Sequence, residues 1–251
     1  MAASKPKKAR PVAAALPIPG APLPAELLTA PRTFGFKLGR STTQPWQYWP
    51  APVITALAAG LAYALLMRPG LNLAAEEALR VAGQSGQPLP AILSHATNAF
   101  GTFFLTILVA LVMWGLGRLG TGTGQRDAKV AEVYSASFVL PLPLYLLSVL
   151  VTWLTPAAAW ALSPAEVTRA EGHLLELQRA ALHSAAHTPA ALLLIAVSLL
   201  GTLGQFMVAY PALKETTGDA GRAARGTLLP LLPALLIQLL SIGALLVGRQ
   251  S

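Results

Sequence analysis

The chain has 251 residues, of which 54% are hydrophobic and only 11% are charged. A soluble domain usually carries about a quarter charged residues, so this chain has too few charges to cover a surface that faces water. The composition therefore excludes an ordinary soluble domain and indicates a lipid bilayer as the solvent. The sequence contains no cysteine, which excludes disulfide frameworks, thiol catalysis and iron–sulfur clusters.

The first segment, residues 1–45, is predicted to be a flexible cytoplasmic arm that is basic and rich in proline. The basic residues that suit anionic lipid headgroups are Lys5, Lys7, Lys8 and Arg10. Four prolines between residues 17 and 24 interrupt the apolar region that a secretory signal needs, so no cleaved signal is expected. We expect polyproline II character here, with at most a short helical turn at residues 23–28.

Residues 46–251 are predicted to form one membrane domain. It contains five apolar segments, each close to the roughly 20 residues that cross a hydrocarbon core. They are residues 52–67, 99–116, 133–154, 188–210 and 227–247. Helix is the open-ended structure that satisfies its own backbone in lipid, and no polar helices are present to cover these segments in water. The predicted fold class is therefore an all-α integral membrane protein, a bundle of five transmembrane helices.

Lysine and arginine predict the orientation. Seven lie in the arm, and three follow each of the second and fourth spans, so thirteen fall on one side and five on the other. The N-terminus is therefore expected in the cytoplasm and the C-terminus outside. Because the basic residues flank membrane spans, they favour anionic headgroups over nucleic acid.

Short helices are expected in the two outer loops. Asn72 can cap a helix that contains Glu76 and Arg80. A capping box at residues 163–166 begins a second helix that runs toward His183.

Uncharged polar residues in the last two spans are the candidate site. They are Ser198, Thr202 and Gln205 in the fourth span, and Gln238 and Ser241 in the fifth. Their first interpretation is interhelical hydrogen bonding, and the alternative is the lining of a solute cavity. Pro141 and Pro143 in the third span, and Pro230 and Pro233 in the fifth, bend or break their helices and keep a carrier open as an alternative.

Other motifs point to chemistry more weakly. The glycine-rich stretch at residues 120–124 lacks the Gly-Lys-Ser/Thr ending of a phosphate-binding loop. His183 and His187 are four residues apart and could face a metal on one helical turn, but no third ligand is evident. We therefore predict no catalytic residue, no cofactor and no metal site, and do not expect an enzyme.

Residues 99–151 resemble the Yip1 family, and residues 204–240 resemble its last two spans. The residues that carry the resemblance are Gly120, Gly122 and Gly124 in a short turn, followed by Tyr134, Ser135 and Pro141. The resemblance covers about residues 46–248 and implies five helices, a cytosolic N-terminus and a C-terminus across the membrane. Eukaryotic members of this family act in vesicle traffic.

The function expected from these features is that of a non-catalytic scaffold or a subunit that binds a partner or lipid in membrane organisation. The alternative is a channel or carrier for a small solute. The expected partners are the bilayer and a membrane or cytosolic protein, with a second copy of the chain as a further candidate. Abundant Ala, Leu and Arg with few Lys suit a high-GC bacterium, so the expected location is the inner membrane.

Overall fold

The computed structural model describes residues 20–42, 47–81, 89–122, 127–160 and 174–250. These residues form helices and connecting turns, with no strand among them. The helices are α1 (Pro24–Thr29), α2 (Pro31–Arg40), α3 (Pro50–Val81), α4 (Leu89–Thr121), α5 (Asp127–Ser137), α6 (Pro141–Leu154), the 3₁₀ helix η1 (Ala157–Trp160), α8 (Leu174–Ala186), α9 (Pro189–Thr217) and α10 (Ala220–Gln250). The prediction of an all-α fold is confirmed.

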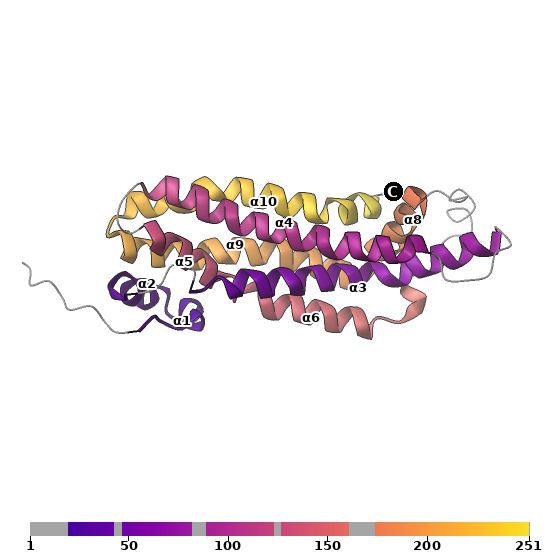
Figure 1. Ribbon diagram of the computed structural model, residues 1–251, viewed down its shortest axis with the longest axis horizontal. Helices are drawn as coiled ribbons and strands as arrows, with labels where there is room; N and C mark the ends of the chain where they lie inside the picture. Colours follow the sequence, from indigo (N-terminus) through magenta and orange to yellow (C-terminus); the bar gives the residue numbers. More distant parts are fainter. Residues whose placement is uncertain (1–19, 43–46, 82–88, 123–126, 161–173, 251) are drawn as a thin grey trace, which may run out of the picture.

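Five segments of these helices are long and apolar enough to cross a membrane. They are Pro50–Asn72, His95–Thr121, Lys129–Leu154, Pro189–Thr217 and Ala220–Val247. Each is longer than the sequence predicted, because the helices continue past the apolar residues into polar turns. The long helices lie side by side, with α1 and α2 at one end of the bundle and the C-terminus at the other (Figure 1).

The third span is two helices rather than one. It breaks at residues 138–140, between α5 and α6, and Pro141 is the first residue of α6. The break exposes the carbonyl of Phe138, which accepts a hydrogen bond from the hydroxyl of Thr55 on α3 at 2.9 Å. Because that carbonyl lies within a candidate membrane span, the bond satisfies a group that lipid could not.

The prediction that Asn72 caps a separate outer helix is wrong. Helix α3 continues through Pro69 to Val81. Tertiary contacts support this continuation: Trp160 donates its indole N–H to the carbonyl of Leu66 at 3.0 Å, and Gly70 lies directly against the backbone of Ala181 on α8. The predicted capping box at residues 163–166 lies outside the described residues, and α8 runs past His183 to Ala186.

Helix α1 lies where a short helical turn was predicted, whereas the prediction of a flexible arm is wrong for residues 31–40, which form α2. Leu27, Phe34 and Leu38 are fully buried in a core cluster with residues of α5 and α9. The physical reason is the spacing of Phe34 and Leu38, four residues apart, which gives α2 one apolar face that packs on α9. Residues 1–19 lie outside the described part of the chain.

Candidate functional site

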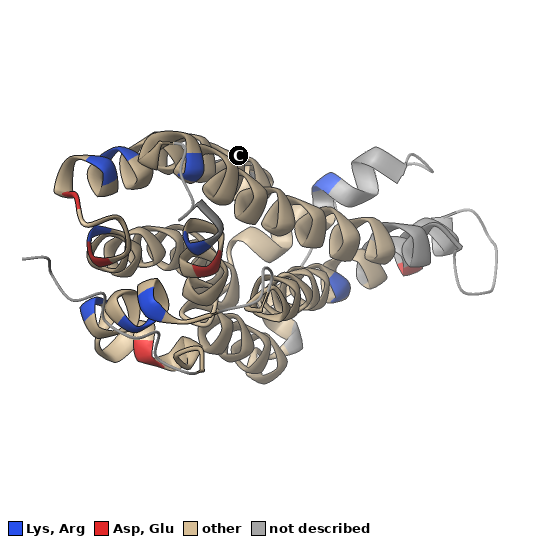
Figure 2. Ribbon diagram, turned by 60° about the vertical axis from the view of Figure 1, so that its left-hand side comes forward, with Lys and Arg blue, Asp and Glu red and all other residues tan. Residues whose placement is uncertain are grey.

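Most of the described Lys and Arg residues lie at one end of the bundle, which we call the basic end (Figure 2). It is built from α1 and α2, the last turns of α4 and α9, and the first turns of α5 and α10. The described Lys and Arg side chains at this end are Arg32, Lys37, Arg40, Arg118, Lys129, Lys214, Arg222 and Arg225. Two others whose side chains are described, Arg68 and Arg179, lie toward the opposite end. The headgroup residues predicted at positions 5, 7, 8 and 10 lie outside the described residues.

Two polar contacts hold the α1–α2 hairpin to this end, and a third lies within the hairpin. Tyr48 donates its hydroxyl hydrogen to the carbonyl of Pro22 at 2.5 Å, and the Lys129 ammonium of α5 donates to the carbonyl of Ser41 at 3.0 Å. Within the hairpin, Lys37 binds the Glu26 carboxylate at 2.6 Å. This hydrogen bond lowers the pKa of Glu26, whereas burial raises the pKa of Tyr48. The contacts fix an element with exposed cations across the end of the bundle.

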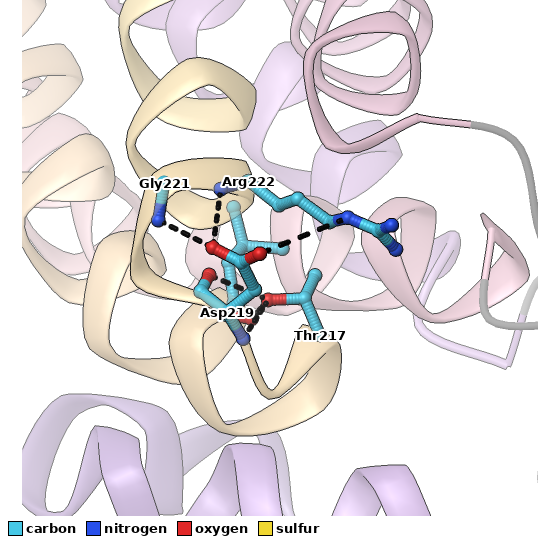
Figure 3. Close-up of polar contacts among 5 residues, drawn as sticks. Thr217, Asp219, Gly221 and Arg222 are labelled. Carbon is cyan, nitrogen blue, oxygen red and sulfur yellow. Dashed lines mark hydrogen bonds and ion pairs between the residues drawn. The ribbon is translucent and has the colours of Figure 1, made fainter.

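The turn between α9 and α10 is ordered by its own side chains (Figure 3). The Asp219 carboxylate accepts hydrogen bonds from the backbone N–H groups of Gly221 at 2.7 Å and Arg222 at 3.1 Å. It therefore acts as the N-cap of α10, and these two bonds lower its pKa. Gly218 ends α9 in the left-handed conformation, at a φ of 69°. This short turn brings Lys214 of α9 and Arg225 of α10 to the same end of the bundle.

Gly120 and Gly122, predicted from the family resemblance, have structural roles in the described chain. Gly120 lies so close to the backbone of Arg225 that a side chain would collide with it. Gly122 follows the last residue of α4 with a φ of 84° and donates its N–H to the carbonyl of Arg118 at 3.1 Å. The pair therefore allows α4 to pack closely on α10 and then to end.

Tyr134 of α5 hydrogen-bonds a carbonyl of α10 that a proline leaves without its helical donor. Pro230 lacks the N–H that would bind the carbonyl of Gly226 in a regular helix, and Tyr134 donates its hydroxyl hydrogen to that carbonyl at 2.6 Å. Its ring also packs edge-on against Phe206 of α9. Sequence reasoning singled out Tyr134 but missed this partner, although the spacing of four residues between Gly226 and Pro230 was a usable signal. The neighbouring Ser135 is half-buried, and Pro141 begins α6.

Four of the five predicted polar residues are buried in the bundle, Ser198, Thr202 and Gln205 on α9 and Gln238 on α10, whereas Ser241 on α10 is half-buried. Gln205 and Gln238 are 1% and 5% exposed. Tyr145 of α6, which was not predicted, lies between the two helices: its hydroxyl is 3.5 Å from that of Ser198 and also hydrogen-bonds Gln238. The hydroxyl of Thr202 donates to the carbonyl of Ser198 within α9, and the hydroxyl of Ser241 donates to Gln238 within α10.

One polar atom in this interior has no hydrogen-bond partner in the described part of the chain. It is Nε2 of Gln205, which carries two donor hydrogens. A buried amide without partners costs free energy that a water molecule or a polar ligand could recover. The unpaired amide therefore marks the place in this interior where a further polar partner would be most favourable.

The two histidines considered as metal ligands lie together, with their ring centroids 4.7 Å apart. Nδ1 of His187 is 2.9 Å from the carbonyl oxygen of His183, so that nitrogen is occupied by a backbone contact. Within the described ranges, no group of three His, Cys, Asp or Glu side chains is close enough to hold a metal ion.

Comparison with known proteins gives no match: no family profile, curated protein or solved structure is similar to this chain. The resemblance to the Yip1 family therefore stays a prediction.

Proposed function

We propose that the chain is a non-catalytic, multi-pass protein of Yip1 type in the bacterial inner membrane, and that its basic end binds anionic headgroups or an acidic cytosolic partner. The observation that carries the proposal is the docked α1–α2 hairpin, which adds Arg32, Lys37 and Arg40 to the cations of α9 and α10. Cytoplasmic leaflets are anionic, so this end faces the cytoplasm in the proposal and the C-terminus lies outside. A scaffold needs such a fixed, charged surface more than it needs a reactive site.

The test is a variant with three exposed cations neutralised, Arg32→Gln, Lys214→Gln and Arg225→Gln. Each cation near a membrane surface contributes about 1 kcal/mol of attraction to anionic lipid. We expect the preference for phosphatidylglycerol over phosphatidylcholine, measured with spin-labelled lipids in vesicles, to fall by about tenfold or more. The matched control, Arg68→Gln toward the opposite end, should leave it unchanged. Equal losses in both variants would contradict the proposal.

The second candidate is a channel or carrier for a small solute, and the unpaired amide of Gln205 favours it. Gln205 lies one turn from Thr202 on the buried face of α9, near the break at residues 138–140 that packs on Gly201 and Gly204. Solute uptake by proteoliposomes tests it. Gln205→Leu removes the polar group without emptying the site, so loss of uptake by a fully folded variant would favour the carrier. Unchanged uptake, or none by the native chain, would favour the scaffold.

A further inference from the structure

A cavity of about 350 Å³ opens at the end of the bundle opposite the basic end. Residues of α3, α4, α8 and α10 line it: Tyr63, Thr97, Asn98, Gly101, Thr102, Leu105, Arg179, Leu182, Leu240, Ser241 and Ala244. Its volume is within the range of pockets that hold small molecules. Neither the interior polar residues nor the basic end uses it, apart from Ser241, which lies at the boundary between the two.

The wall of the cavity has a polar part and an apolar part. Hydrogen-bond donors come from the guanidinium of Arg179, the amide of Asn98 and the hydroxyls of Thr97 and Thr102. Asn98 is 8% exposed, so the cavity lies against an amide that the bundle has buried. Arg179 is the one charged side chain in the lining, and it is exposed. A guanidinium with amide and hydroxyl donors is suited to the oxygens of a phosphate group.

The apolar part selects the kind of phosphate. Leu105, Leu182 and Leu240 line the cavity beside the polar groups, and an inorganic phosphate ion would leave them without a partner. The side chain of Leu240 is 74% exposed on the outer surface of α10, where lipid would lie around the bundle. The cavity therefore adjoins the lipid phase rather than being closed off inside the protein.

The depth of the cavity also matches a phospholipid. Thr97 lies in the first turn of the span that begins at His95, and Leu105 is eight residues further along α4, roughly 12 Å deeper at 1.5 Å per residue. On α10 the lining residues lie within the last two turns before Val247. Thr97 and Asn98 near the end of one span, with Leu105 and Leu240 deeper in two spans, correspond to a headgroup with the start of an acyl chain.

We propose that this cavity is a binding site for one anionic phospholipid, whose phosphate group contacts Arg179 and Asn98 and whose glycerol and upper acyl chain contact the three leucines. The inference goes beyond the proposed function, because the site lies at the other end of the molecule and uses none of the basic-end cations.

Gly101 provides a direct test. A Cβ at this position has no other side chain or distant backbone within 4 Å, and Gly101 lines the cavity, so Gly101→Leu would place a larger side chain there. Gly115 on the same helix has equally open surroundings but is outside the lining, which makes Gly115→Leu the matched control. Both substitutions replace a helical glycine, so their effects on helix stability should be alike.

The experiment is native mass spectrometry of the purified full chain, titrated with phosphatidylglycerol, in a background that carries Arg32→Gln, Lys214→Gln and Arg225→Gln. We expect one lipid to be retained by this background and by its Gly115→Leu form, and to be lost from its Gly101→Leu form. Arg179→Gln should weaken retention by about tenfold, since it removes the charge-assisted bonds to phosphate. Arg68→Gln, a charge control toward the same end, should not.

Two further arms separate the sources of the phosphate. The first arm adds millimolar inorganic phosphate. If phosphate displaces the lipid, or raises the thermal stability of the native chain but not of Gly101→Leu, the site takes its phosphate group from solution. The proposal would be overturned if Gly101→Leu retained phosphatidylglycerol as strongly as the native chain does. It would also be overturned if uncharged diacylglycerol were retained as strongly as phosphatidylglycerol. Failure of the basic-end test leaves these outcomes unaffected, because those cations are already absent from the background.

Discussion

At the scale of single residues, prolines inside apolar helices leave backbone carbonyls that other side chains must satisfy. Pro230 leaves the carbonyl of Gly226 without its helical donor, and the hydroxyl of Tyr134 replaces it. In a bilayer no water would compensate for losing this bond. The tyrosine is therefore part of what allows α10 to contain a proline within the bundle.

We predict that Tyr134→Phe destabilises the folded chain by about 1–3 kcal/mol, the usual cost of leaving a buried polar group unpaired. The ring contact with Phe206 should persist, so the change isolates the hydroxyl. Unfolding by denaturant in detergent micelles measures it. Tyr210→Phe, on an exposed part of α9, is the matched control and should have almost no effect.

A second substitution shows whether the proline is the cause. Pro230→Ala returns an N–H four residues after Gly226, so the cost of Tyr134→Phe should shrink in that background. An undiminished cost in the double variant would mean that the hydroxyl acts through another partner, such as Thr227, with which it also hydrogen-bonds.

Asp219 adds a dependence on pH at the turn between α9 and α10. Its backbone hydrogen bonds lower its pKa from an ordinary value near 3.8. A lowered pKa means that the cap contributes stability above that ordinary value and loses it as pH falls through the folded pKa. The protection of the Gly221 and Arg222 amides from hydrogen exchange, taken relative to their intrinsic exchange rates at each pH, should therefore fall below about pH 4. Asp219→Asn, which also caps helices, should remove the pH dependence, and Asp219→Ala should quicken exchange at neutral pH.

At the scale of elements, the α1–α2 hairpin depends on packing rather than on its own helical preference. Helices of six and ten residues are too short to be stable alone in water. Burial of Phe34 and Leu38 against α9 makes up the difference, and Gly35 allows the close approach because its α-carbon lies against the backbone of Ala212. The hairpin can therefore undock as a unit while the bundle stays folded.

We predict that Phe34→Ala releases the hairpin, because it removes about 3–5 kcal/mol of packing from one small element. Hydrogen exchange followed by mass spectrometry should show faster exchange over residues 24–40 and no change in α4. Phe36→Ala is the control, since Phe36 is 43% exposed and its ring lies under the guanidinium of Arg40. Faster exchange throughout the bundle would show instead that the hairpin and the spans unfold together.

The elements also show what could be predicted from the sequence. Hydropathy was sufficient to predict the five long apolar helices, because each one is marked by its own run of apolar residues. The docked hairpin was missed because Phe34 and Leu38 lie among charged and proline residues in the sequence. Their burial depends on contacts with α9, which is far along the chain. For the same reason the continuation of α3 past Pro69 and the cavity around Gly101 could not be foreseen: four separate helices form that cavity.

At the scale of the whole molecule, the proposed membrane orientation would place the two ends of the bundle on opposite sides of a membrane, and five crossings would also separate the two termini. The absence of cysteine makes this simple to test, because a single introduced thiol is the one reactive site in the chain. Ala220 lies at the basic end, between α9 and α10, and Ala158 lies at the opposite end, in η1; both are exposed.

In spheroplasts, a membrane-impermeant maleimide should label Ala158→Cys and should not label Ala220→Cys. After lysis both should react, which shows that each thiol is accessible. The opposite pattern would keep five crossings but reverse the orientation, so the basic end would face outward and its cations would meet a leaflet with fewer anionic lipids. Labelling of both positions before lysis would contradict the crossing of α9, because α9 is the candidate span that separates the two sites along the chain.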